Sequence, residues 1–185
     1  MSRYRRLLTG PTYFFTVVAY RRRPIFCDVA LRAALHDAIH TVRQTRPFSI
    51  DAWVLLPDHM HCIWTLPEDD HAYSIRWAEI KRYVSSWCRL ALRDSTLLTQ
   101  AALHRRESSI WQRRFWEHQI RDERDFEKHM DYIHFNPVKH GYVRQVQDWP
   151  HSTFHRHARD GVYPLDWGGS SEIDGLDFRV AVGCA

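Results

Sequence analysis

The chain has 185 residues, a length that fits one domain with or without a tail and that can bury a hydrophobic core. Its four cysteines form no Cys-x-x-Cys pair, which excludes a zinc knuckle and a disulfide framework and favours a reducing cytoplasm. The first residues lack the apolar core of a signal peptide, and the longest apolar run, residues 13–20, is too short to span a bilayer. We therefore expect a soluble, cytoplasmic protein without a membrane partner.

The net charge of +4 is unevenly distributed. Arginine dominates residues 1–46, whereas acidic residues outnumber arginines in residues 148–185. Lysine is scarce, and a planar guanidinium suits phosphate groups and guanine edges better than an ammonium does. A GC-rich genome also favours arginine codons, so the composition leaves both explanations open.

Residues 13–20 are aromatic and β-branched and predict a buried strand between Gly10-Pro11 and the break at residues 21–24. Asp28 can cap a helix that runs to about Thr45, where Arg46-Pro47 ends it.

Residues 48–56 and 59–66 predict two further strands, joined by the tight connection Pro57-Asp58. His59 and His61 lie at the start of the second strand, and the two-residue period of a strand points both imidazoles to one face and Met60 to the other. This arrangement can hold a divalent metal. The alternative is two histidines that merely lie at a strand end, since a similar pair, His155 and His157, sits among charged residues.

Helical spacing follows in residues 73–92, and residues 94–109 are polar and predict a fraying helix end and a mobile loop. Residues 110–120 resume strand character, with His118 either facing the metal or only packing. The order strand, helix, strand, strand, helix, strand predicts an α+β fold with a ferredoxin-like antiparallel sheet (βαββαβ) and helices on one face.

A final helix is expected from Asp122 to Phe135, because Asn136-Pro137 would close it. Its apolar stripe contains Phe126, Met130 and Ile133. Tyr132 lies off that stripe, and Asn136, four residues on, shares the face of Tyr132. Residues 1–147 would form this domain, and residues 148–185 an irregular C-terminal tail.

A phenol with an ordinary pKa near 10 is a poor nucleophile, so attack by Tyr132 on a phosphate would need a cation that also polarises the phosphate. His59, His61 and the amide oxygen of Asn136 could hold Mg²⁺ or Mn²⁺, and manganese suits this ligand set better. The alternatives are an ordinary tyrosine, one of eight, and an Asn-Pro pair that only stops a helix.

At this point the residues resemble a family. His59-Met60-His61 resembles the motif of HUH single-strand DNA endonucleases, and residues 131–138 resemble the tyrosine helix of their single-tyrosine transposase branch. The resemblance is closer still to the REP-associated tyrosine transposases and covers nearly the whole chain. It rests on residues 53–64, 110–118 and 149–156.

The resemblance implies a metal-dependent nick in single-stranded DNA, a 5′-phosphotyrosine on Tyr132 and recognition of imperfect palindromic hairpins beside a short guide sequence. It also implies His59 and His61 as ligands and places Asn136 where related transposases have a polar third ligand. Some related transposases are dimers, so a monomer and a homodimer both remain open.

DNA binding needs clustered cations, and we expect them in the N-terminal arginines, in the cluster after the first strand and in two later basic pairs. The candidates are Arg3, Arg5, Arg6, Arg21, Arg22, Arg23, Lys81, Arg82, Arg113 and Arg114. Exposed aromatic residues such as Trp87 or Trp116 could stack on unpaired bases.

Three functions compete. The favoured one is a metal-dependent endonuclease and strand transferase. The second is a domesticated hairpin-DNA-binding protein without nicking activity, and the third is a metallohydrolase that activates water at His59 and His61.

Overall fold

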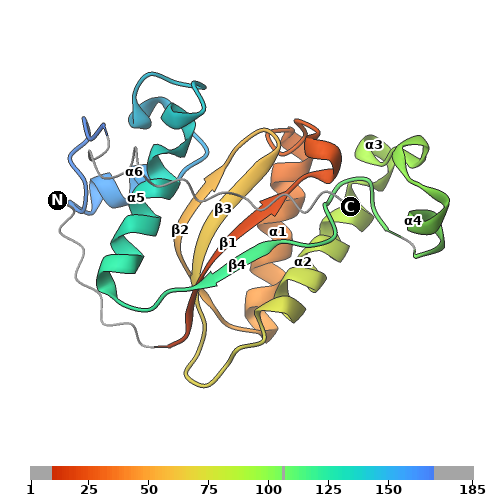
Figure 1. Ribbon diagram of the computed structural model, residues 1–185, viewed down its shortest axis with the longest axis horizontal. Coiled ribbons are helices and arrows are strands. Elements are labelled where there is room, and N and C mark those ends of the chain that lie inside the picture. The colour runs from red at the N-terminus through yellow and green to blue at the C-terminus, as the bar shows by residue number, and fades with distance from the viewer. Residues whose placement is uncertain (1–9, 106, 169–185) are drawn as a thin grey trace.

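The structure, a computed structural model, describes residues 10–105 and 107–168 (Figure 1). Its strands are β1 (Thr12–Val18), β2 (Ser49–Leu55), β3 (His59–Thr65) and β4 (Trp116–Gln119). Its α-helices are α1 (Val29–Thr45), α2 (Tyr73–Trp87), α3 (Arg89–Leu92), α4 (Gln100–His104), α5 (Glu123–Lys139) and α6 (Phe154–Arg159). Short 3-10 turns are η1 (Tyr20–Arg22), η2 (Ser95–Leu97) and η3 (Val146–Asp148). The predicted N-terminal cations Arg3, Arg5 and Arg6 lie outside the described residues.

The four strands form one antiparallel sheet in the order β2-β3-β1-β4. The two strands joined by α1, β1 and β2, are therefore separated by β3, and β4 returns to the other side of β1. This is the split βαββαβ arrangement, and the predicted ferredoxin-like fold is confirmed.

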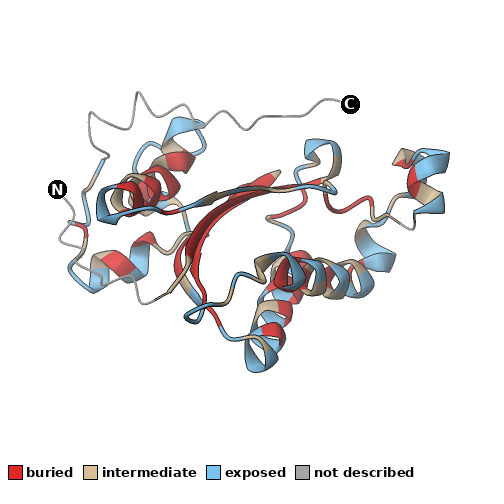
Figure 2. Cartoon of the chain, turned by 60° about the horizontal axis from the view of Figure 1, so that its bottom comes forward, coloured by how far each residue is buried: buried red, intermediate tan, exposed pale blue. Residues whose placement is uncertain are grey.

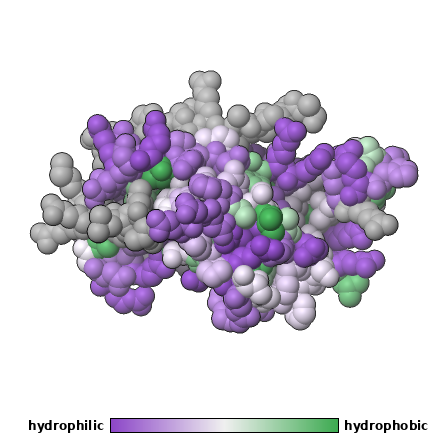
Figure 3. Space-filling view, turned by 90° about the horizontal axis from the view of Figure 1, so that it is seen from below, coloured by the Kyte–Doolittle hydropathy of each residue, from purple (hydrophilic) through white to green (hydrophobic). Residues whose placement is uncertain are grey.

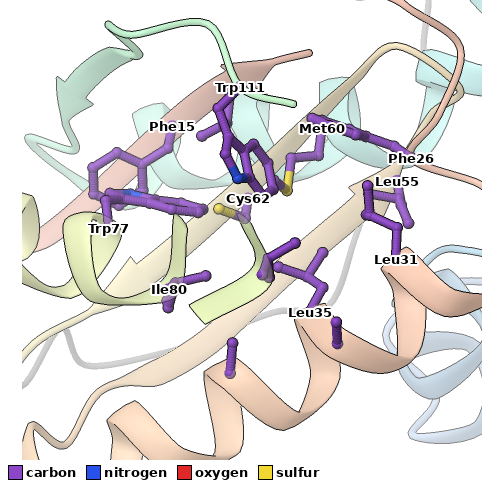
Figure 4. Packing of buried hydrophobic residues seen from close by; sticks show 14 of the residues in the cluster. Phe15, Phe26, Leu31, Leu35, Leu55, Met60, Cys62, Trp77, Ile80 and Trp111 are labelled. Carbon is purple, nitrogen blue, oxygen red and sulfur yellow. The ribbon is translucent and has the colours of Figure 1, made fainter. Parts of the chain in front are cut away.

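Helices cover both faces of the sheet, and each face has its own hydrophobic cluster (Figure 2). The first cluster joins the sheet to α1 and α2 and contains Phe15, Met60, Cys62 and Trp77 (Figure 4). The second cluster joins the opposite face to α5 and α6 and contains Phe14. Because both faces are covered, every residue of β1 and β3 is buried.

Helix α1 forms where its local signals predict it. The Asp28 carboxylate accepts hydrogen bonds from the backbone nitrogens of Ala30 and Leu31, which satisfies two free N–H groups of the first turn. Its buried residues follow the helical period and are Leu31, Ala34, Leu35, Ala38 and Val42.

The predicted strand over residues 110–120 is shorter in the structure. Only Trp116–Gln119 forms β4, and Trp111 makes an isolated bridge with Ala19. Trp111 packs against Phe26 with ring centroids 5.0 Å apart, and this packing anchors the chain before the strand begins. The preceding segment, expected to be a loop, contains η2 and α4.

Helix α5 continues past the predicted end at Phe135, so that prediction is wrong. Pro137 lies inside the helix, in its last turn. Because proline has no N–H, one backbone hydrogen bond is missing there, but the helix continues to Lys139. The His140 nitrogen donates to the Asn136 carbonyl at 3.0 Å, and Gly141 then adopts a left-handed backbone with φ of 71°. Asn136 is therefore a helical residue.

The segment from residue 149 is more regular than expected. Its backbone pairs with the free edge of β2, since Leu55 N donates to His151 O and Thr153 N donates to Trp53 O, each at 2.9 Å. Trp149 Nε1 also donates to Leu55 O at 3.0 Å. Helix α6 follows, so this segment covers the sheet edge that would otherwise be open. The boundary at residue 147 stays a prediction.

The molecular face in Figure 3 is largely hydrophilic, with isolated hydrophobic residues. Within the described part of the chain, no helix combines the length and apolar character needed to cross a bilayer.

Candidate metal and tyrosine site

His59 and His61 lie side by side on the face of the sheet that α5 covers. Both are buried, and their ring centroids are 5.0 Å apart. Met60, between them, belongs to the cluster on the opposite face. The alternation predicted from the two-residue period is therefore present.

A hydrogen bond at Nδ1 fixes each imidazole. His59 Nδ1 donates to Asp58 Oδ1 at 2.7 Å, and His61 Nδ1 is 2.8 Å from Thr16 Oγ1. Arg22 in turn donates to Asp58 Oδ2 at 3.0 Å from a turn in which its φ is 52°, a left-handed value that is uncommon for a non-glycine residue. Since Nδ1 is engaged in both rings, Nε2 is the nitrogen left for a ligand, as in many metal-binding histidines.

The electrostatics keep the acid charged and His61 neutral. Burial acts to raise the pKa of Asp58, but hydrogen bonds from His59 and Arg22 outweigh it and lower that pKa to about 2. Burial, with the nearby His59 and His140, holds the pKa of His61 well below its ordinary value. A neutral imidazole has the lone pair that a metal ion requires.

Tyr132 of α5 faces these histidines. It is buried, and its ring centroid lies 5.2 Å from that of His61 and 6.1 Å from that of Phe14. The Lys139 ammonium lies 5.1 Å from the centre of the Tyr132 ring. Tyr132 belongs to the same buried cluster as Phe126, Met130 and Ile133, so α5 is buried around more than its predicted apolar stripe.

Asn136 lies one helical turn beyond Tyr132, and His140 lies one turn further. The ring of His140 is 5.2 Å from that of His59, while Tyr132 contacts His61. Along the helix, Asn136 therefore lies between these two contacts, and its side chain is fully buried.

Three polar atoms of His61 and Asn136 are buried without a partner, and two of them suit a cation. Among the described residues, none hydrogen-bonds to His61 Nε2 or to Asn136 Oδ1 and Nδ2. An unsatisfied buried polar group is costly, and few occur in a native fold. An imidazole nitrogen and an amide oxygen are both ligands for a divalent metal, so the residues present fit Mn²⁺ or Mg²⁺.

A second group of possible metal ligands lies on the same face. His118 of β4 and Asp125 and His129 of α5 offer ligand atoms within 4.8 Å of one another. Asp125 Oδ2 already accepts hydrogen bonds from His118 Nε2 at 2.9 Å and from Arg121 Nε at 3.0 Å. His129 Nδ1 donates to the Asp125 carbonyl at 2.7 Å. These hydrogen bonds give the three residues a structural role, because they link β4 to α5.

His118 therefore contacts Asp125, and Phe14 separates this group from His61. The Phe14 ring centroid is 5.4 Å from that of His61 and 4.8 Å from that of His129. The sequence left open whether His118 faces the metal or only packs. In the structure it packs against His129 and hydrogen-bonds to Asp125.

Among the described residues, the predicted DNA-binding cations differ in exposure and in their contacts. Arg21, Arg82, Arg113 and Arg114 are exposed. Arg22 is joined to the site through Asp58. Two others have structural roles, since Arg23 donates to the Leu92 and Ser109 carbonyls. Lys81 donates to the Gln112 carbonyl, and burial lowers its pKa to about 8.

Four residues of the site were not singled out from the sequence: Thr16, Asp58, Lys139 and His140. Two of them had a usable signal. Asp58 precedes the first histidine, and His140 continues the four-residue spacing of Tyr132 and Asn136. Thr16 had none, because only the strand register pairs it with His61.

Comparisons with known proteins agree with this fold. No protein-family model matches the chain. A REP-associated tyrosine transposase of Escherichia coli is 49% identical over 170 residues, covering 91% of this chain and 92% of that protein. A Haemophilus influenzae protein with the same family name is 43% identical over 174 residues, covering 94% of this chain and 97% of that protein.

A solved structure, described as a REP-associated tyrosine transposase bound to a REP hairpin, superposes with a TM-score of 0.72. It is 48% identical and covers 92% of this chain and 93% of its own. The fold is therefore that of a DNA-processing transposase. The chain belongs to the family of REP-associated tyrosine transposases.

Proposed function

We propose that this protein is a metal-dependent endonuclease and strand transferase that acts on single-stranded REP-type hairpin DNA through a 5′-phosphotyrosine on Tyr132. The observation that carries the proposal is the convergence of Tyr132 with two buried histidines whose Nδ1 atoms are already engaged.

His59, His61 and Asn136 would hold the metal. When bound there, a divalent cation neutralises charge on the phosphate under attack and polarises its phosphorus–oxygen bonds. Asp58 and Thr16 orient the imidazoles, and the packing of α5 against β3 keeps Asn136 and Tyr132 on the same side.

Tyr132 performs the exchange. Its phenolic oxygen attacks the scissile phosphorus, an oxygen–phosphorus bond forms, and the bond from phosphorus to the 3′ oxygen breaks. The phenolic proton goes to solvent, and the leaving 3′ oxygen takes up a proton to become a 3′ hydroxyl. The Lys139 ammonium, 5.1 Å from the centre of the ring, adds positive charge beside the reacting group. One phosphoester replaces another, so the reverse reaction can rejoin strands without ATP.

The DNA substrate is proposed from the relative whose solved structure is described as bound to a REP hairpin. Exposed Arg21, Arg82, Arg113 and Arg114 are the candidates for phosphate contacts among the described residues. We place the protein in the cytoplasm, where such a DNA substrate would lie.

The test is incubation with end-labelled single-stranded hairpin DNA and Mn²⁺ or Mg²⁺, followed by denaturing gels. Wild-type protein should give a free 3′-hydroxyl fragment and a slower protein-linked 3′ segment, and Tyr132→Phe should give neither while still binding the hairpin. Tyr83→Phe, a change on α2 outside the site, is the matched control and should react normally. Cleavage that persists in Tyr132→Phe without an adduct would point to the hydrolase, and binding without cleavage to the domesticated binding protein.

A further inference from the structure

A second feature lies at the β2 edge of the sheet. A groove of about 450 Å³ opens there, where α1, β2 and the segment before α6 meet. The residues that line it include Ile39, Arg43, Ile50, Trp53, Thr153 and Arg156. Trp53 pairs with Cys62 and packs against the α1–α2 cluster, so its side chain lies on the opposite face of the sheet from His61 and Tyr132.

The lining combines an aromatic surface with positive charge. Trp53 is half-buried and lies with Ile39 and Ile50, while Arg43 and Arg156 supply two guanidinium groups. None of the described residues that line the groove carries a carboxylate. This composition suits a ligand with a flat base and a negative charge.

Both ends of the groove are held in place before any ligand arrives. Trp53 N donates to Thr153 Oγ1 at 2.8 Å, and Thr153 N donates back to Trp53 O at 2.9 Å. One terminal nitrogen of Arg156 donates to the Ile50 and Asp51 carbonyls at 3.1 and 2.8 Å. The tryptophan and this arginine are thus fixed beside each other by the pairing of two distant chain segments.

Arg43 is anchored in the same manner. Its Nε donates to the Phe48 carbonyl at 2.9 Å, and its guanidinium lies 5.7 Å from the centre of the Phe48 ring. The terminal nitrogens of Arg43, and the nitrogens of Arg156 other than the anchored one, hydrogen-bond to no residue in the described part of the chain. These donors remain for an anion, and pre-organised donors lose little side-chain entropy on binding.

We propose that this groove binds an unpaired nucleotide of the DNA strand outside the hairpin, with the base stacked on Trp53 and a phosphate held by Arg43 and Arg156. The proposal rests on the proposed DNA substrate, and it adds an anchoring site on the opposite face of the sheet from Tyr132. Stacking of a base on an aromatic side chain typically changes affinity by about tenfold.

The first experiment measures fluorescence anisotropy of two labelled DNAs, a blunt hairpin and the same hairpin with a short unpaired thymidine tail. The tail should tighten binding by the wild-type protein about tenfold, the stacking scale above. Arg43→Gln, a change at an exposed side chain, and Trp53→Ala, checked for folding by its melting curve, should remove this gain and leave the blunt-hairpin Kd unchanged. Arg93→Gln, exposed at the end of α3, is the charge-matched control and should behave as wild type. A gain that survives in both groove variants, or an equal loss on the blunt hairpin, would overturn the inference.

The second experiment locates the base. A tail that carries 5-iodo-deoxyuridine, irradiated in the complex, should crosslink to the peptide that contains Trp53, and a crosslink found only on other peptides contradicts the proposal. If free thymidine monophosphate competes as well as the tailed DNA, the groove is a mononucleotide site and the strand assignment is wrong. If the protein binds no hairpin at all, the proposed substrate is wrong. An isolated thymidine strand that carries the same iodinated base then tests the groove by itself, and it should still crosslink to the peptide that contains Trp53.

Discussion

Thr16 and Asp58 show how single residues prepare this site. Each contacts one imidazole at Nδ1, and each comes from a different structural source: Thr16 from the neighbouring strand and Asp58 from the turn before β3. A histidine that donates Nδ1–H presents an unprotonated Nε2, as His59 does by donating to the Asp58 carboxylate, and the contact with Thr16 leaves Nε2 as the other ring nitrogen of His61.

We expect Asp58→Asn to weaken Mn²⁺ binding about 10- to 100-fold, the usual cost of losing a partner of a metal-binding histidine. The change removes the charge that orients His59 and the ion pair with Arg22. Isothermal titration with Mn²⁺ measures it. Asp37→Asn, at an exposed acid on α1 that contacts His36, is the control and should bind Mn²⁺ as wild type does. Equal affinities in all three proteins would show that Asp58 does not orient a ligand.

Asn136 gives a second prediction at this scale. If its amide oxygen is a ligand, Asn136→Ala should reduce the rise in melting temperature that Mn²⁺ causes, whereas Asn136→Asp should keep that rise because it retains an oxygen ligand. Differential scanning calorimetry with and without Mn²⁺ measures both variants. A full metal-induced rise in Asn136→Ala would remove Asn136 from the ligand set.

The two histidines and the tyrosine could be predicted because strand and helix periods place side chains from sequence alone. Thr16 could not, because its pairing with His61 depends on the register between β1 and β3, which hydrogen bonds between distant residues determine. His140 was missed for a related reason: the helix was expected to end before it.

At the scale of elements, α5 connects both halves of the site. In the first turn of α5, Asp125 accepts hydrogen bonds from His118 of β4 and from Arg121. Tyr132 and Asn136 lie on later turns of the same helix. Pro137 does not interrupt this helix, because a proline in the last turn removes one hydrogen bond without displacing the earlier turns. Local sequence rules favour a stop at Asn136-Pro137, and tertiary packing of a buried helix outweighs them.

Asp125→Asn should destabilise the protein by about 2 kcal/mol, the scale of a lost hydrogen bond to a charged group. Asp125 is buried, and its Oδ2 accepts from His118 and from the backbone and side chain of Arg121, whereas an amide oxygen lacks the negative charge that strengthens these bonds. Urea unfolding measures the loss. Glu123→Gln, an exposed acid in the same turn, should cost clearly less, and an equal cost in both variants would mean that only the charge at the helix start matters.

At the scale of the whole molecule, buried histidines set the response to acid. Burial lowers the pKa of His129 and of His157 to about 4, against about 6.5 for the unfolded chain. Between these values the unfolded chain binds protons that the folded chain does not, so stability is fully present above pH about 6.5 and is lost as pH falls toward about 4. Asp58 and Asp125, whose pKa values are lowered to about 2, lose their contributions only below pH about 4.

We therefore expect the melting temperature to fall steadily between pH about 6.5 and pH about 4. His157→Gln should make this fall shallower, because glutamine can still donate to the Asp51 carbonyl and has no proton to gain. His36→Gln, at an exposed histidine on α1, is the control and should keep the wild-type slope. A wild-type slope in His157→Gln would show that its burial does not contribute.

The order of elements was enough to predict the sheet, since the split pattern has few compact solutions. The route of residues 149–159 was not predictable in this way. It depends on which sheet edge remains free, and this is known only once β2 is placed outside β3.

The most direct test of the central claim is mass spectrometry of the covalent product formed with 5′-unlabelled hairpin DNA and Mn²⁺. After nuclease and trypsin digestion, the peptide from His129 to Lys139 contains Tyr132 as its one tyrosine. We predict that this peptide carries the mass of a 5′-linked nucleotide phosphate on Tyr132. An adduct on another peptide, or cleaved DNA without any modified peptide, would contradict the account.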